Sequence, residues 1–227
     1  APEFFDRIFS TPSYEWTRTA QIQLGVEKGE RIGTPGTQFS YSDMGYLIVG
    51  ELIETYTGKS LDGGIKELLG FEKLSLDRTD FERIDTQTDL LRIHQYLQGK
   101  DTYNFSPTID YYGGGGILSN TEELIDFFQA LFQGKIFENP ATLNLMLKPV
   151  SYSIKPKLDY QMGMYKVQVK GMDAYCHSGF WGTQVLYIPK MDLYLAANYS
   201  GGWGGGMVAP IFDKFLNAME KVIPNNK

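Results

Sequence analysis

The spacing of apolar residues changes along the chain, and this change predicts the order of its secondary-structure elements. The strongest helical pattern covers residues 43–56, where Ser42 can cap the helix and Gly58 lies just past its end. Its apolar positions keep the three- and four-residue spacing of one helix face: Met44, Leu47, Ile48, Leu52 and Ile53. We therefore expect a well-formed helix here.

The rest of the first 150 residues is predicted to be helical or irregular. Residues 1–14 read as irregular, residues 15–28 as a helix, and residues 71–112 as polar loops with one helical turn near residues 90–96. A shorter helix is expected after Ser60, another after the capping box Ser119-Asn120-Thr121-Glu122, and a third from Asn139-Pro140. Residues 113–116 are consecutive glycines, which indicates that the backbone passes close to another part of the molecule.

From about residue 160 the pattern changes to strands separated by short turns. Strands are expected at residues 160–170, 174–179, 183–189 and 193–200, and a final helix at residues 208–222 after the glycine-rich residues 201–206. Short turns join neighbouring strands into an antiparallel meander. We therefore predict an α+β fold, an antiparallel sheet flanked by helices. It forms one domain over residues 1–227, with a mostly helical part at 1–150 and the sheet and last helix at 151–227.

Composition and charge exclude some classes of protein. Hydrophobic residues make up 42% of the 227 positions, which suits a globular domain. A net charge of −6 without a basic stripe argues against nucleic acid as a partner. The single cysteine, Cys176, cannot form an internal disulfide, and no Cys/His cluster suggests a metal. No apolar run reaches the ~18 residues of a membrane span, so membrane association would need an upstream anchor.

Two short motifs contain the candidate chemistry. Tyr41-Ser42-Asp43 stands at the start of the strong helix, and His177-Ser178-Gly179 lies on a predicted strand. Each motif alone is weak, because most of the 15 tyrosines are expected to pack and a single strand histidine is usually a core or edge residue. Asp43 alone would also suit the positive end of the helix dipole. Phe180, Trp181 and Trp203 fit an apolar pocket rim or, equally, a core.

In their longer contexts the two motifs resemble those of the penicillin-recognising serine hydrolases. Residues 35–54 resemble the Tyr-x-Asn region of class C β-lactamases, D-alanyl-D-alanine carboxypeptidases and related esterases, and residues 177–198 resemble their third motif, with His-x-Gly in place of Lys-Thr-Gly. Residues 113–119 resemble the glycine turn of the same superfamily. The resemblance runs from about Trp16 to the last helix. It implies the β-lactamase/transpeptidase-like fold and hydrolysis of an ester, a D-amino-acid peptide or a β-lactam through an acyl-enzyme.

The resemblance also implies a role for each motif residue. Tyr41 would lie near the serine nucleophile and shuttle its proton, and His177 would supply a hydrogen bond or partial positive charge towards Tyr41. Asp43, Ser178, Gly179 and Phe180 would bind substrate, with one amide of the strand completing an oxyanion hole. The implied partner is a small-molecule or peptide substrate, and no cofactor or metal is expected. A periplasmic, secreted or cell-envelope location is favoured over a cytoplasmic one, and the sequence does not reveal the oligomeric state.

The chain departs from the family pattern in three places. It contains no Ser-x-x-Lys, since Ser153-Ile154-Lys155 has the wrong spacing. In the family this pair precedes the Tyr motif, so we expect it upstream of these residues and expect this chain to be inert. A sheet without its N-terminal strands would also expose an edge and lower stability. The alternative is a pseudoenzyme or a domain that binds cell-wall peptide or a protein. Asp43 in place of Asn, and His177 in place of Lys, argue against efficient β-lactam turnover.

Overall fold

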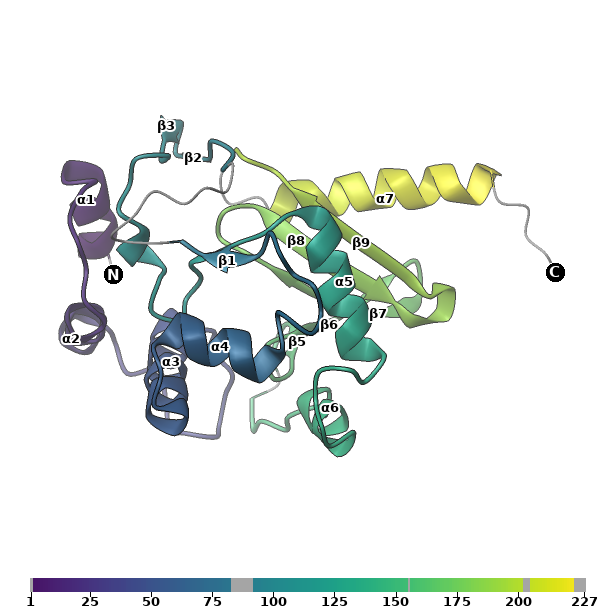
Figure 1. Ribbon diagram of the computed structural model, residues 1–227, viewed down its shortest axis with the longest axis horizontal. Helices are drawn as coiled ribbons and strands as arrows, with labels where there is room; N and C mark the ends of the chain where they lie inside the picture. The colour runs from purple at the N-terminus through teal and green to yellow at the C-terminus, as the bar shows by residue number, and fades with distance from the viewer. Residues whose placement is uncertain (1, 83–91, 155, 202–204, 223–227) are drawn as a thin grey trace.

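An antiparallel sheet of five strands lies at the centre of the structure, a computed structural model that describes residues 2–82, 92–154, 156–201 and 205–222 (Figure 1). Each strand pairs with its sequence neighbour, which confirms the predicted meander and the α+β class. One predicted strand is wrong in detail, because residues 160–170 form a hairpin of two strands around Gly163. The strands are β5 (Asp159–Tyr160), β6 (Tyr165–Val169), β7 (Met172–Ser178), β8 (Thr183–Ile188) and β9 (Leu193–Asn198).

Helices cover both faces of this sheet (Figure 1). On one face α7 (Gly205–Val222) packs Phe212 and Leu216 against Ala174 and Ile188, which are fully buried. On the other face α5 (Thr121–Phe132) packs Phe128 and Leu131 against Val185 and Tyr194. Neighbouring residues of a strand point to opposite faces, so Val185 belongs to one core and Leu186 to the other. This burial on two sides fixes the register of the strands, including β7, which carries His177.

The remaining elements are helices, short helical turns and short strands outside this sheet. The predicted 43–56 helix is confirmed as α3, and it ends at Gly58 in the left-handed conformation. The short strands form two pairs, β1 with β4 and β2 with β3. These elements are α1 (Pro2–Ser10), α2 (Arg18–Lys28), α3 (Asp43–Thr57), α4 (Leu61–Leu69), α6 (Ala141–Met146), β1 (Asp80–Phe81), β2 (Tyr96–Leu97), β3 (Lys100–Asp101), β4 (Ile117–Leu118), η1 (Pro107–Ile109) and η2 (Pro189–Met191).

Two predictions about the first helices are wrong. Residues 2–10 are helical rather than irregular, because Ile8 is buried in a cluster with Trp16 and Leu97 that only the folded chain creates. The helix predicted to begin at residue 15 begins at Arg18, where the Thr17 side chain accepts a hydrogen bond from the Ala20 N–H.

Other differences concern helix starts and one loop. Ser42 occupies the cap position of α3 but makes no side-chain capping bond, whereas Asn120 accepts from the Glu123 N–H at 2.8 Å at the start of α5. Of the helical turn predicted near residues 90–96, residues 90 and 91 lie outside the described residues, residues 92–95 have no regular structure and Tyr96 begins β2. Trp203 also lies outside the described residues. In the part of the chain that the structure describes, no helix combines the length and apolar character needed to cross a membrane.

The turn between β7 and β8 contains a glycine that no other residue can replace without displacement of the backbone. Gly182 has a φ of +84°, and a Cβ there would lie 2.0 Å from the Tyr199 carbonyl oxygen. Gly171, in the turn between β6 and β7, has a similar φ of +73°, but a Cβ added to it would meet no atom within 4 Å. An alanine at either position therefore has the cost of a left-handed backbone, whereas only an alanine at Gly182 also has the cost of steric overlap.

We expect Gly171→Ala to lower the free energy of unfolding by about 1 kcal/mol, the cost of a left-handed alanine. Gly182→Ala should cost about 1–3 kcal/mol more, because the new methyl group overlaps the backbone of residue 199. Urea denaturation of both variants and the parent chain measures the difference. Equal losses in the two variants would contradict the steric argument.

Candidate functional site

A cavity of about 1590 Å³ lies between the helical part of the chain and the sheet. All the residues that the sequence singled out lie on its wall: Tyr41, Asp43, His177, Ser178, Gly179 and Phe180. We call these residues the motif wall. Tyr41 and Asp43 come from the start of α3, and His177 and Ser178 from the end of β7. The fold therefore joins two motifs that are more than a hundred residues apart, while the chemical roles of their residues remain predictions.

Tyr41 is partly exposed on the motif wall. Its ring meets the Tyr160 ring edge-on, with 5.5 Å between centroids, and lies 6.1 Å from the His177 ring. Burial, reinforced by the neighbouring Tyr46 and Asp43, raises the pKa of Tyr41 to about 12. The phenol is therefore neutral near pH 7 and can donate a hydrogen bond to a nucleophile or a leaving group.

His177 is hydrogen-bonded to Tyr160 rather than to Tyr41. Its Nε2 lies 3.3 Å from the Tyr160 hydroxyl. Burial lowers the pKa of His177, and a hydrogen bond with the Ser178 backbone offsets part of this effect. The ring is therefore neutral near pH 7, so it supplies no full positive charge towards Tyr41.

Two carboxyl groups give the cavity an acidic side. The Trp181 indole N–H donates to the Asp110 carboxylate, and Asp110 lies close enough to Asp43 for the two charges to interact. Burial raises the pKa of Asp110 to about 6, with a smaller contribution from the Asp43 charge against the opposing effect of Trp181. Burial also raises the pKa of Asp43. A group that carries a negative charge would be repelled here once both carboxyls are ionised.

The turn after β7 supports the motif wall from behind. The Gly179 N–H donates to the Thr183 carbonyl at 2.7 Å, so this amide is used within the turn. An oxyanion-hole donor among the amides of this strand stays a prediction. The Trp181 carbonyl accepts from the Gln95 and Asn198 side chains at 2.9 and 3.2 Å. Phe180 packs between the Phe5 and Trp181 rings while it lines the cavity, so it has both of its predicted roles, rim and core.

The glycine run fits against the start of α3. A Cβ at Gly113 would lie 2.3 Å from the Tyr46 carbonyl oxygen, which confirms that the backbone passes close to another element here. A Cβ at Gly114 would lie 4.0 Å from the Cβ of Asp43. The run therefore places Asp110, just before it, beside the motif wall.

Four residues of the site were not identified from the sequence: Tyr46, Tyr160, Tyr165 and Asp110. Tyr46 follows Asp43 by three positions on α3, a spacing that puts both on one side of the helix, and this signal was available. Tyr160 and Tyr165 reach His177 through strand pairing. Nothing in their spacing from residue 41 indicates that contact.

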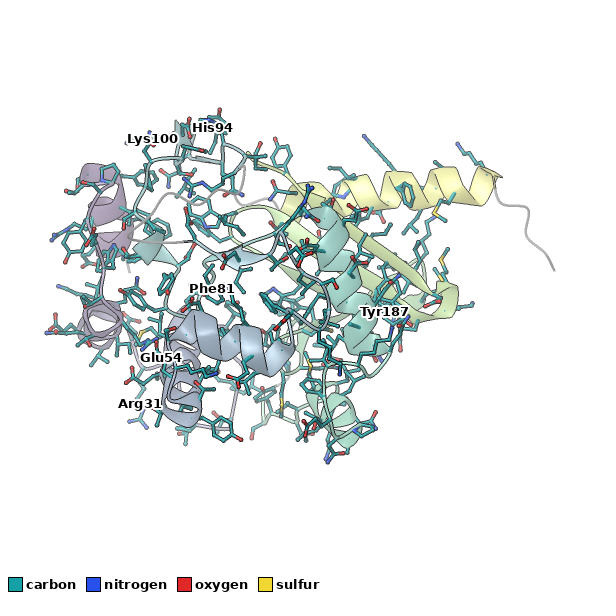
Figure 2. The ribbon with its side chains drawn as sticks, in the orientation of Figure 1. Arg31, Glu54, Phe81, His94, Lys100 and Tyr187 are labelled. Carbon is teal, nitrogen blue, oxygen red and sulfur yellow. The ribbon has the colours of Figure 1, made fainter. Side chains whose placement is uncertain are left out.

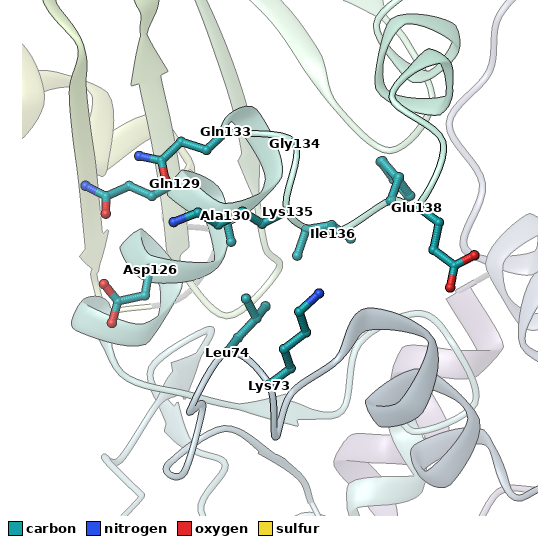
Figure 3. A pocket seen from close by; sticks show the side chains of 11 residues that line it. Lys73, Leu74, Asp126, Gln129, Ala130, Gln133, Gly134, Lys135, Ile136 and Glu138 are labelled. Carbon is teal, nitrogen blue, oxygen red and sulfur yellow. The ribbon is translucent and has the colours of Figure 1, made fainter.

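A second cavity of about 510 Å³ lies between α5 and the loop at Lys73 and Leu74 (Figure 3). Its charged lining residues include Asp126, Lys135 and Glu138, and none of the motif wall residues reaches it. Within residues 2–82, 92–154, 156–201 and 205–222, no group of three or more His, Cys, Asp or Glu side chains is arranged to hold a metal ion. The candidate chemistry is therefore concentrated at the larger cavity.

The sequence matches one protein family over most of its length. The family model described as Beta-lactamase matches residues 2–203.

Solved structures share the fold at low sequence identity. A D-stereospecific amidohydrolase from a Streptomyces species superposes with a TM-score of 0.74 at 21% identity, covering 96% of this chain and 65% of that one. A penicillin binding protein from Bacillus halodurans gives 0.73 at 16%, covering 93% and 66%. A D-amino acid amidase from Ochrobactrum anthropi SV3 gives 0.73 at 20%, covering 92% and 68%. The chain thus spans about two thirds of the length of these proteins.

The raised pKa of Asp110 predicts a specific dependence on pH. A carboxyl whose pKa is about 6 in the folded chain and 3.8 ordinarily binds its proton more tightly when folded. Its contribution to the free energy of unfolding is therefore fully present below about pH 4 and is lost as the pH rises through about 6. The melting temperature of the parent chain relative to Asp110→Asn should fall across that range.

The Trp181 indole N–H reports the same titration directly. Its proton chemical shift should change with a midpoint near pH 6 in the parent chain and stay constant in Asp110→Asn, in which an amide oxygen replaces the carboxylate. A midpoint near 4 would show that the carboxyl is not perturbed.

Proposed function

The chain belongs to the β-lactamase family of serine hydrolases, and on that premise we propose that it forms the Tyr41–His177 side of an acyl-transfer site. The observation that carries the proposal is the meeting of Tyr41, Asp43 and His177 on one cavity wall. The reaction would pass through an acyl-enzyme, with the neutral Tyr41 phenol transferring a proton near the nucleophile. No metal or cofactor enters this chemistry.

The charges around Tyr41 and His177 favour an uncharged ester or an amide of a D-amino acid as substrate. His177 is neutral, and Asp43 and Asp110 add negative charge near it, so a substrate carboxylate finds no cationic partner among these residues. Two arginines, Arg78 and Arg92, also line the cavity, and Arg92 forms an ion pair with Glu82. β-Lactam antibiotics carry such a carboxylate. Two of the structurally similar proteins are a D-stereospecific amidohydrolase and a D-amino acid amidase, which supports an amide with D configuration.

The nucleophile of this site is proposed to come from a Ser-x-x-Lys segment outside the 227 residues. No Ser-x-x-Lys occurs in the sequence. The cavity of about 1590 Å³ is larger than the roughly 300–1,000 Å³ usual for small-molecule pockets, so substrate alone does not fill it. The spare volume is consistent with a helical segment that carries the serine and lysine into the cavity, one helical turn apart.

A specific observation favours a second function. The absence of Ser-x-x-Lys from the chain is what a non-catalytic domain would show, and such a domain would use the same cavity to bind a cell-wall peptide or a protein. The coding sequence that precedes residue 1 separates the two. A Ser-x-x-Lys there supports the enzymatic function, and its absence from the whole gene product supports the function as a binding domain.

We expect the 227-residue chain to hydrolyse no p-nitrophenyl ester and to take up no fluorophosphonate label. The product of the whole gene should be labelled on one serine, because it would contain the missing nucleophile. Mass spectrometry of both labelled proteins identifies the site. If the 227-residue chain hydrolysed the ester and the His177→Ala variant did not, the predicted inertness of the chain would be contradicted. If the product of the whole gene folded but took up no label, the proposed enzymatic function would be refuted.

Asp43→Asn in the whole gene product should speed acylation by a fluorescent penicillin by roughly tenfold. The amide supplies the N–H donor that a carboxylate lacks, and one such hydrogen bond is worth about 1.4 kcal/mol. Asp192→Asn, which removes an equal charge from the exposed end of η2, is the matched control and should change little. A decrease in Asp43→Asn would mean that the carboxylate itself serves the reaction.

A further inference from the structure

Three side chains form a hydrogen-bonded series that runs from behind the motif wall to His177 on that wall. The Tyr46 and Tyr160 hydroxyls are hydrogen-bonded to each other, and the Tyr160 hydroxyl lies 3.3 Å from His177 Nε2. Tyr46 comes from α3, Tyr160 from β5 and His177 from β7. The series therefore crosses from the helical part of the chain to the sheet at the point where the motif wall is assembled.

The two phenols lie behind the cavity rather than on its wall. Tyr41, Tyr165 and His177 line the cavity, and Tyr46 and Tyr160 do not. Tyr160 is only 8% exposed, whereas Tyr41 is 41% exposed. Rings surround Tyr160, with Phe39 stacked on it at 5.2 Å between centroids. Tyr160 thus has no route to a substrate and can act only through the residues that it touches.

The contacts of His177 indicate which group donates and which accepts in each hydrogen bond of the series. In the described residues no carboxylate pairs with His177, and its ring partners are the phenols of Tyr41, Tyr160 and Tyr165. The ring is placed by geometry, since its Nε2 lies 3.3 Å from the Tyr160 hydroxyl. A phenol donates a hydrogen bond better than its oxygen accepts one, so the favoured arrangement has Tyr160 donating to Nε2 and the ring proton on the donating nitrogen Nδ1. The Ser178 backbone acts in the same direction, because it stabilises the protonated ring.

A neutral imidazole carries one N–H, so a donating Nδ1 leaves Nε2 as an acceptor. Tyr160 must then donate its O–H to Nε2, and its oxygen accepts from Tyr46. Burial and the neighbouring phenols raise the pKa of Tyr160 far above its usual value, so the phenol keeps the proton that this arrangement needs. Each hydroxyl therefore donates one hydrogen bond: Tyr46 donates to Tyr160, and Tyr160 donates to His177.

We propose that Tyr160 is a positioning residue that, with Tyr46 behind it, holds His177 as the neutral Nδ1–H tautomer with Nε2 as acceptor. This assignment rests on the proposed function, because it specifies the protonation state of His177 in that site. A buried phenol here takes the part that a carboxylate commonly plays in orienting a histidine. Because Tyr160 occupies Nε2, His177 does not compete for the Tyr41 proton, which stays available to the nucleophile.

The chain offers a direct test, because it contains only two histidines, His94 and His177. Ring nitrogen NMR of the ¹⁵N-labelled 227-residue chain, at a pH where both rings are neutral, distinguishes the two tautomers. We expect His177 to show a protonated Nδ1 and an unprotonated Nε2. In Tyr160→Phe the ratio of Nδ1–H to Nε2–H should fall roughly fivefold, because one neutral hydrogen bond that selects the tautomer is lost.

Two matched references accompany the measurement. Tyr165→Phe removes a phenol whose ring lies 5.5 Å from the His177 ring without removing a bond to Nε2, so it should leave the tautomer ratio unchanged. His94, labelled near the β2–β3 hairpin in Figure 2, binds Asp101 through Nδ1 at 2.7 Å and should keep its spectrum in every variant. A change in His94 would reveal a general disturbance of the fold.

The outcomes decide the proposal without any hydrolytic assay. An Nε2–H tautomer in the parent chain, or an equal ratio in the parent and Tyr160→Phe, would overturn it. If Tyr160→Phe does not fold, Tyr46→Phe keeps the Tyr160 hydroxyl and should preserve a majority of Nδ1–H, and loss of that majority would again overturn it. The fluorophosphonate experiment tests the nucleophile separately, so either proposal can fail while the other stands.

Discussion

The contact between Tyr46 of α3 and Tyr160 of β5 joins the two halves of the site. Everything else about the motif wall follows from holding the start of this helix against the end of the sheet. Gly113 lets the glycine run at residues 113–116 lie against the same helix, because any side chain there would overlap the Tyr46 carbonyl. Burial of the sheet on both faces then fixes where β7 ends, and with it the position of His177. The site is therefore a product of packing between elements and not of any one motif.

Burial moves the titrating groups of the site in a common direction. It raises the pKa of Tyr41 and of Asp110 and lowers that of His177, so each group is pushed towards its uncharged form. Near pH 7 this leaves two neutral hydrogen-bonding rings beside a pair of acids. These groups suit the proposed proton transfer to an uncharged substrate better than they suit the binding of a carboxylate.

The free edge of the sheet at β9 and the size of the cavity are two features of the described residues. β9 is the last strand of the sheet in the described residues, so one of its edges has no strand partner there. The cavity is larger than a small substrate requires. The structurally similar proteins are longer, since this chain covers 65–68% of their length. The proposed site thus has a defined wall, a defined polarity and room for the group that would attack the substrate.

The sequence alone determined the elements with strong periodicity and the two motifs. The apolar spacing of α3, the short turns between the strands from β7 to β9 and the cap of α5 are local signals, and the structure confirms these elements with shifts of a few residues. Tyr41, Asp43 and His177 were singled out by the resemblance of residues 35–54 and 177–198 to the motifs of a known family. Helix α1 was not, because the partners of Ile8 are distant in the sequence.

Only the tertiary structure decided which groups accompany the motifs. Tyr160 meets Tyr46 across 114 positions, and Asp110 meets Trp181 across 71. No periodicity encodes such contacts, since they depend on how whole elements pack. The protonation states likewise follow from desolvation, which exists only when the chain is folded. The sequence therefore determined which residue types are present for the chemistry, and the packing of α3 against the sheet decided their partners and their charge.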